Sequence, residues 1–125
     1  MTIAQVSRRC GVSADTLRYY ERMGLLPSIA RTPGGIRDYS EDDCSWVDYI
    51  KCMRTAGVSV ETLAEYVALY RQGDETIVAR KQLLLRQRDE IAARIEALTD
   101  TLCRLDRKLD GYEHMLEFES EHLKR

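Results

Sequence analysis

A chain of 125 residues can hold one modest core, or a small domain followed by an extended element. With 44% hydrophobic and 32% charged residues, and neither a membrane-length apolar run nor a signal-peptide pattern, we expect a cytoplasmic protein without a membrane partner. The formal net charge of −2 excludes nucleic-acid binding through bulk positive charge, but residues 1–40 carry six arginines against three acids, a local charge of +3.

Two short helices open the predicted fold. Thr2 and Gln5 have the spacing of a capping box and begin a helix that Gly11 ends. Ser13 caps a second helix, which stops near Gly24. Two short helices joined by a tight connection are the outline of a helix-turn-helix.

A small β-hairpin is predicted next. Pro33 and the paired glycines at 34–35 lie between two short segments that contain Ile29 and Ile36. Strands this short are not stable alone, so the hairpin must rest on the helices before it. A hairpin in this place after a helix-turn-helix is a wing.

Two further helices are predicted between the hairpin and residue 73. Ser40, followed by three acids, is a strong helix start, and the apolar spacing behind it runs to Gly57. Ser59 caps the next helix, which continues to about Gln72. The compact part of the chain is expected to end at the following Gly73-Asp74.

From Thr76 onward, apolar residues recur with the heptad spacing of a coiled coil. So long a helix cannot bury its stripe on a small domain, and the simplest partner is a second copy of the chain. We therefore divide the chain into a compact domain at 1–75, a dimerisation helix at 76–118 and a short tail at 119–125. Ten of the twelve seam positions are apolar; the two series are Ile77, Leu84, Ile91, Leu98, Leu105 and Tyr112, and Lys81, Arg88, Ile95, Leu102, Leu109 and Leu116.

Three segments closely resemble the MerR family of bacterial transcription regulators. They are residues 12–27, VSADTLRYYERMGLLP; residues 34–40, GGIRDYS; and residues 53–59, MRTAGVS. The resemblance continues into the long helix and so covers essentially the whole chain. It implies a mainly α fold, in which a winged helix-turn-helix with a small β-hairpin wing precedes a long, antiparallel coiled-coil dimerisation helix.

The same resemblance implies how the chain meets DNA. The second helix would enter the major groove and the wing would lie against the backbone of promoter DNA. Family members sit on promoters whose spacer between the two RNA polymerase elements is too long, and they activate by distorting that DNA. A guanidinium can read guanine or hold phosphate, and a phenol can donate to phosphate. The DNA-binding residues expected on this basis are Thr16, Arg18, Tyr19, Tyr20, Arg31, Gly35, Arg37, Tyr39 and Arg54.

The two tyrosines of the second helix differ in how well they are placed to contact DNA. Leu17 and Tyr20 are three residues apart, which puts Tyr20 near the apolar face of the helix. Tyr20 is therefore as readily a core residue as a DNA contact. Tyr19 is the better candidate for DNA.

Cys52 is the candidate sensor. The four cysteines, Cys10, Cys44, Cys52 and Cys103, include no C-x-x-C and no neighbouring histidine, so we expect free thiols, no local metal site and no cofactor. A cysteine at position 52 resembles a branch of the family that answers aldehydes, other electrophiles or nitrosative stress through one thiol. Against this stands the ordinary use of cysteine as a small packing residue, because Lys51 and Arg54 point away from it and Asp48 opposes a thiolate.

Three alternatives remain open at this point. Within the regulator class, a small apolar or metallic ligand between the dimer helix and the first domain is the alternative to a thiol sensor. A coiled-coil adaptor that uses the first domain for protein contact is disfavoured by the arginine-bearing wing. An enzyme is disfavoured because no acid pair, nucleophile–base set or phosphate-binding glycine loop is present, since glycines 34–35 are explained by the wing turn.

Overall fold

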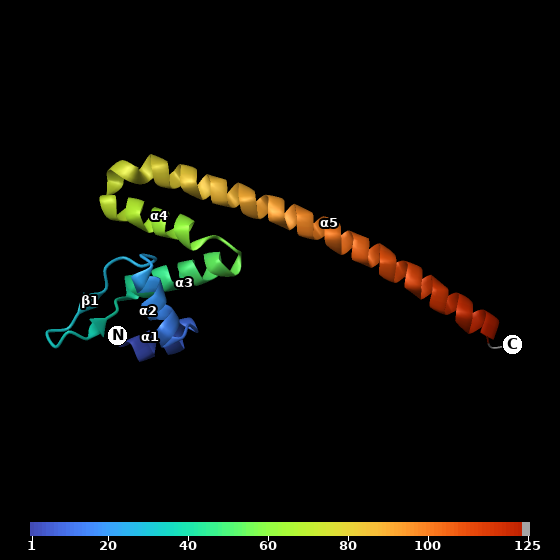
Figure 1. Ribbon diagram of the computed structural model, residues 1–125, viewed down its shortest axis with the longest axis horizontal. Coiled ribbons are helices and arrows are strands. Elements are labelled where there is room, and N and C mark those ends of the chain that lie inside the picture. Colours follow the sequence, from blue (N-terminus) through green and yellow to red (C-terminus); the bar gives the residue numbers. More distant parts are fainter. Residues whose placement is uncertain (124–125) are drawn as a thin grey trace. The chain divides into compact units, whose positions relative to one another are not determined.

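The computed structural model describes residues 1–123 and divides into two compact units, residues 1–87 and a second unit that begins at Arg88. No helix within the described part is long and apolar enough to cross a membrane. The elements are drawn in Figure 1: α1 (Ile3–Cys10), α2 (Ala14–Arg22), β1 (Ala30–Arg31), β2 (Arg37–Asp38), α3 (Glu41–Thr55), α4 (Val60–Gln72), the 3₁₀ turn η1 (Asp74–Thr76) and α5 (Ile77–Leu123).

The predicted helix starts are confirmed by their caps. Thr2 Oγ1 accepts from the backbone N–H of Gln5 at 3.2 Å, and Gln5 Oε1 accepts from the backbone N–H of Thr2 at 2.8 Å, which completes the capping box. The side chains of Ser13, Ser40 and Ser59 accept in the same way at the starts of α2, α3 and α4. Each cap satisfies a backbone donor that the helix itself leaves unpaired, so the local sequence alone fixes these boundaries.

The predicted hairpin is confirmed, with strands of two residues each. Ala30 pairs with Asp38 and Arg31 pairs with Arg37. Between the strands, the backbone N–H of Gly35 donates to the carbonyl of Thr32 at 2.8 Å, and Gly35 has φ = 83°, a conformation that favours glycine. Ile29 and Ile36 flank the strands without belonging to them: Ile29 is buried, whereas Ile36 at the turn is 65% exposed.

The core of the first unit lies among α1 to α4. Its fully buried side chains come from every helix of this unit and from the segments between them, so the two short helix pairs and the hairpin share one core. Leu83, in the second turn of α5, is also buried, which ties the start of the long helix to this core. The largest fully buried side chains are Tyr39, Leu17, Leu25, Leu26, Ile50, Val6, Val47 and Val67.

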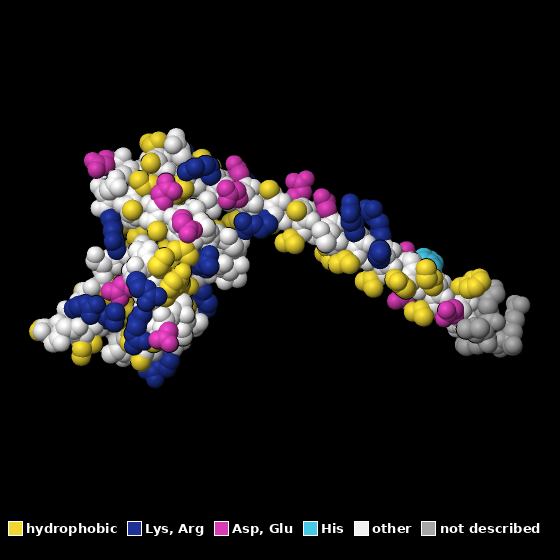
Figure 2. Space-filling model, in the orientation of Figure 1, with side chains coloured by type: hydrophobic (Ala, Val, Ile, Leu, Met, Phe, Trp, Pro, Cys, Tyr) yellow, Lys and Arg dark blue, Asp and Glu magenta, His cyan; other side chains and the backbone are white. Residues whose placement is uncertain are grey.

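Helix α5 runs without a break past Gly111, where a glycine lowers helix stability. It begins one residue after the predicted Thr76, whose hydroxyl donates to the carbonyl of Leu69 at 2.7 Å. In the second unit its apolar side chains are exposed in the single chain, and Figure 2 shows them in series along the helix. Among these exposed residues are Ile95, Leu98, Leu102, Leu105, Leu109, Tyr112 and Leu116.

Candidate nucleic-acid interface

Helix α2 carries an exposed polar face opposite its buried side chains. Thr16 is half-buried and closes the N-terminal cap, since Ser13 Oγ accepts from its backbone N–H at 3.1 Å. Arg18 is exposed and forms an ion pair with Asp15 one turn earlier, at 2.9 Å. An exposed pair of this kind contributes little to stability, so Arg18 can exchange Asp15 for a phosphate or a base at small cost. On the face in Figure 2, basic side chains gather over α1, α2 and the hairpin.

The structure separates the two tyrosines of α2. Tyr20 is 7% exposed, and burial raises the pKa of its hydroxyl. Tyr19 is half-buried, with the guanidinium of Arg22 over its ring at 5.6 Å from the ring centre. This placement favours a packing role for Tyr20 and leaves Tyr19 with the surface position.

A residue that sequence reasoning missed joins the wing to α2. Glu21 Oε2 accepts from Arg37 Nε at 2.5 Å, and its other oxygen lies 3.7 Å from an Arg31 terminal nitrogen. Arg31 also donates to the carbonyl of Gly35 at 3.1 Å, across the wing turn. One carboxylate on α2 therefore holds an arginine on each strand of the hairpin. The sequence shows Glu21 as the single acid between Arg18 and Arg22. Charge spacing alone does not predict that it pairs with the arginines ten and sixteen residues later.

Tyr39 lies in the core, although the family resemblance implied a wing contact. It is 2% exposed, and its buried hydroxyl has no hydrogen-bond partner among the described residues. Burial raises the pKa of this hydroxyl, and the charge of Glu21 raises it further. The structure therefore places Tyr39 in the core, near enough to Glu21 and Arg37 for their charges to act on its hydroxyl.

Arg54, near the end of α3, is exposed. Its terminal nitrogen donates to the carbonyl of Val58 at 2.8 Å, across the turn between α3 and α4. Its charge acts on Tyr20, whose pKa it lowers against the larger effect of burial. The site thus gathers Arg18, Arg31, Arg37 and Arg54 around α2, and two of these four already hold the hairpin.

Two further basic residues link segments of the first unit through hydrogen bonds to backbone carbonyls. Lys51 Nζ donates to the carbonyl of Cys10 at 3.0 Å, at the C-terminal end of α1, and Arg71 donates to the carbonyl of Leu26. A cation at the C-terminal end of α1 is favourable because a helix end leaves carbonyl acceptors unpaired, whereas Leu26 lies in the loop after α2. Lys51 and Arg54 both donate to backbone carbonyls rather than to Cys52, which agrees with the expectation that they point away from it.

The cysteines fall into two classes. Cys52 and Cys103 are exposed, whereas Cys10 and Cys44 are buried, where a cysteine acts as a small packing residue. Burial raises the pKa of Cys10 to about 11, and Asp48 and Cys44 raise it further. Cys52 lies close enough to Tyr49 for its charge to raise the pKa of that hydroxyl, after burial and Tyr66. Among the described residues, no three histidine, cysteine or acidic side chains group as a metal site requires.

The fold has a capped helix pair, a wing joined to the second helix by Glu21, and four arginines near that helix. These features define a winged helix-turn-helix DNA-binding protein. The family model of MerR helix-turn-helix regulatory proteins matches residues 1–69, and the MerR DNA-binding model matches residues 45–108. The chain belongs to the MerR family of transcriptional regulators. It is therefore a DNA-binding regulator rather than an enzyme or an adaptor.

Individual relatives agree with this assignment. The HTH-type transcriptional regulator AdhR of Bacillus subtilis is 52% identical over 91 residues, which cover 73% of this chain and 65% of AdhR. A crystal structure from Listeria monocytogenes assigned to the MerR family is 44% identical and matches 99% of this chain and 94% of its own with a TM-score of 0.95. HiNmlR, a MerR family regulator lacking the sensor domain and bound to promoter DNA, is 31% identical and matches 90% of this chain and 89% of its own with a TM-score of 0.82.

Proposed function

We propose that two copies of this chain bind one promoter, distort a spacer that is too long for RNA polymerase, and change that distortion when Cys52 is modified by an electrophile or a nitrosating agent. The observation that carries the proposal is the arginine-bearing wing fastened to α2 by Glu21. The Glu21 contacts hold α2 and the hairpin together as one rigid surface. A protein that bends DNA needs such a surface, because a flexible one would adapt to the shape of undistorted DNA.

The homodimer is supported by the exposed apolar stripe of α5. Leu98, Leu102 and Leu105 are between 54% and 65% exposed in the single chain, at the spacing of a coiled-coil seam. The exposure of these apolar side chains to water is unfavourable, and the same stripe on a second copy of α5 can cover them. We assign DNA binding to residues 1–75 and dimerisation to residues 76–118. Of the expected tail at 119–125, residues up to Leu123 continue α5, and residues 124–125 lie outside the described residues. The antiparallel pairing follows from the family resemblance.

We assign the DNA contacts to the exposed and half-buried members of the expected set. Side chains on α2 would approach base edges, whereas the wing and the end of α3 would hold phosphates. Tyr20 and Tyr39 support this surface from the core. The proposed contacts are Thr16, Arg18, Tyr19, Arg31, Gly35, Arg37 and Arg54.

The thiol response rests on the exposure of Cys52 and on its resemblance to the thiol-responsive branch of the family. With an aldehyde, the sulfur forms a bond to the carbonyl carbon and the thiol proton moves to the carbonyl oxygen, which gives a hemithioacetal. The added group would press on the neighbouring Tyr49 and so shift the packing of α3. The alternative within the same class is an inducer that binds without forming a bond.

The DNA-binding part is tested by selecting bound duplexes from a random-sequence pool and footprinting the result. We expect two half-sites related by two-fold symmetry, an affinity that falls with salt, and a loss of affinity for Arg18→Ala and Arg37→Ala. A single half-site, or affinities unchanged in both variants at moderate salt, contradicts the proposal.

The thiol part is tested separately, on promoter DNA and by mass spectrometry after exposure to formaldehyde or a nitrosating agent. Cys52→Ser should bind DNA normally and lose the response. Serine variants of Cys10, Cys44 and Cys103 should respond like the unaltered protein. A Cys52→Ser protein that still responds fully disproves the thiol switch and leaves the DNA-binding assignment intact.

A further inference from the structure

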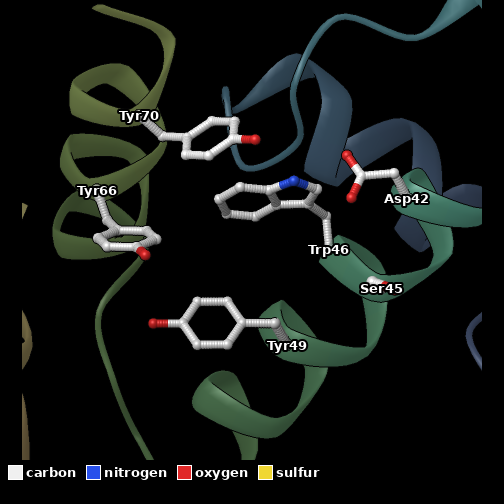
Figure 3. Close-up of a pocket in the computed structure, with 6 residues that line it drawn as sticks. All are labelled: Asp42, Ser45, Trp46, Tyr49, Tyr66 and Tyr70. Carbon is white, nitrogen blue, oxygen red and sulfur yellow. The ribbon is translucent and has the colours of Figure 1, made fainter. Parts of the chain in front are cut away.

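Four aromatic side chains surround a hollow between α3 and α4. Trp46 and Tyr49 come from α3, and Tyr66 and Tyr70 come from α4. The hollow measures about 300 Å³, which is at the lower end of the range for small-molecule sites. Figure 3 shows the indole of Trp46 between the rings of Tyr70 and Tyr49, with Tyr66 facing it from α4.

Helical spacing brings these rings together. Asp42, Ser45, Trp46 and Tyr49 are three, four and seven residues apart along α3, so they share one face of that helix. Tyr66 and Tyr70 are four apart along α4. The ring centre of Trp46 lies 4.9 Å from that of Tyr70, 5.9 Å from that of Tyr66 and 6.1 Å from that of Tyr49. These are edge and tilted contacts, the arrangements that aromatic pairs prefer.

The charge around the hollow has one sign. Asp42 lines it, and no lysine or arginine does. Within residues 1–123, the Asp42 carboxylate has no salt-bridge partner, unlike its neighbour Glu41, which pairs with Arg9 at 2.6 Å. Figure 3 shows this carboxylate turned toward the indole of Trp46. An unpaired carboxylate beside electron-rich ring faces favours a positively charged occupant.

The same aromatic cluster already holds one cation. The guanidinium of Arg80, in the first turns of α5, lies over the ring of Tyr70 at 5.4 Å from the ring centre. Arg80 is held there by Thr76 Oγ1, which accepts from its Nε at 3.0 Å. Arg80 does not line the hollow, so a second cation there would meet the remaining rings without displacing it.

We propose that this hollow binds a small organic cation of the quaternary or alkylated ammonium class. The ring faces of Trp46, Tyr49 and Tyr66 stabilise the charge by cation–π contact, and Asp42 neutralises it at the rim. A neutral apolar molecule would contact the rings but would not use the charge that Asp42, a first-turn acid of α3, places at the rim. Binding in this hollow requires neither a modified Cys52 nor DNA.

Trp46 makes the test direct, because it is the one tryptophan of the chain. Its fluorescence is recorded for the full-length protein without DNA while choline chloride is added, with sodium chloride at matched ionic strength as the blank. The comparison ligand is 3,3-dimethylbutan-1-ol, which has the shape of choline without its charge. We expect a saturable change with choline and an affinity roughly tenfold lower for the alcohol.

Three variants locate the binding. Asp42→Asn and Tyr66→Leu should each weaken choline binding about three- to thirtyfold, whereas Tyr66→Phe keeps the ring and should bind nearly as the unaltered protein does. Glu65→Gln removes one exposed charge beside the site without lining it and should change nothing. Circular dichroism confirms that each variant is folded before its affinity is compared.

Each contrary result overturns the proposal in its own way. Equal affinities for choline and the alcohol describe an apolar pocket rather than a cation site. Unchanged binding in Asp42→Asn removes the electrostatic argument. No response to choline, together with a Trp46 that acrylamide cannot quench, means that another copy of the chain covers the hollow.

Discussion

The carboxylate of Glu21 accepts a hydrogen bond from Nε of Arg37 at 2.5 Å, and this contact joins α2 to the second strand of the wing. Both side chains are partly buried, at 26% and 28% exposed, so solvent screens the pair less than it screens a surface ion pair. The bond uses Nε, and within residues 1–123 the terminal nitrogens of Arg37 have no hydrogen-bond partner, so they can meet a phosphate. Glu21 is thus a positioning residue for the proposed DNA contact of Arg37.

Glu21→Ala should lower the affinity for the selected promoter duplex roughly tenfold, because it removes a charge-assisted hydrogen bond that orients Arg37. Affinity for unrelated duplex DNA should stay equal or rise, since the variant loses a negative charge near phosphate. The measurement is fluorescence anisotropy on both duplexes at several salt concentrations.

Glu65→Ala is the matched control, because it removes an exposed acid from α4 away from the wing. It should leave the ratio of the two affinities unchanged. If Glu21→Ala binds the promoter as tightly as the unaltered protein, the wing arginines are positioned without Glu21 and the rigid-surface argument loses its support.

Tyr39→Phe separates packing from DNA contact. The hydroxyl is buried and has no hydrogen-bond partner within residues 1–123, so its removal should leave the free energy of unfolding unchanged or raise it by up to about 1 kcal/mol. Tyr39→Ala, which removes the ring as well, should lower it by about 3–5 kcal/mol. Chemical denaturation measures both values.

The same variant tests the wing contact that the family resemblance implied. If Tyr39 acts only from the core, Tyr39→Phe should bind the promoter duplex within twofold of the unaltered protein. A clear fall in affinity without a fall in stability would instead put the hydroxyl on a phosphate in the complex. That result would require the hydroxyl to become exposed when the wing meets DNA.

The helices were predictable because their signals are local. Ser13, Ser40 and Ser59 each cap the helix that follows them, and glycines end or interrupt the apolar patterns. The arrangement of the site was less predictable, because it depends on pairs far apart in the sequence. Nothing in the sequence near Glu21 predicts that Arg37 folds back onto it. Nor does the sequence predict that the aromatic rings of α3 and α4 meet, because their spacing is typical of an ordinary packed helix face.

The four thiols should react at two distinct rates. Cys52 and Cys103 are exposed and should be alkylated quickly by iodoacetamide at pH 8, whereas the buried Cys10 and Cys44 should be protected until the protein unfolds. Mass spectrometry of quenched samples counts the modified sites. Rapid labelling of Cys10 in the folded protein would contradict the burial that raises its pKa.

The raised pKa of Cys10 also sets a pH dependence for stability. Its thiol stays protonated in the folded state up to about pH 11 but ionises near pH 9 once unfolded. Below pH 9 both states hold the proton and the contribution is complete; between about pH 9 and 11 the unfolded state is favoured increasingly, so stability falls. Cys10→Ala should show a shallower fall of melting temperature across this interval, and an identical slope in both proteins would rule out Cys10 as its cause.

Leu102→Asp tests whether the stripe of α5 is the dimer interface. Leu102 is 59% exposed in the single chain, so the substitution leaves the folded monomer nearly undisturbed. In a paired seam it would bury a carboxylate from each copy, which should raise the dissociation constant of the dimer on the order of a hundredfold. Promoter affinity should fall with it, because two half-sites are then bound independently. Analytical ultracentrifugation and anisotropy measure the two effects.

Ala93→Asp provides the control for helix propensity and charge, because it lies nine residues earlier and therefore on the opposite side of the helix. It should remain dimeric and bind the promoter normally. If both variants dimerise like the unaltered chain, the copies meet through another surface, and the leucines of α5 need a different partner. If both become monomeric, the loss reflects a weakened helix and not a broken seam, so only the contrast between the two positions supports the interface.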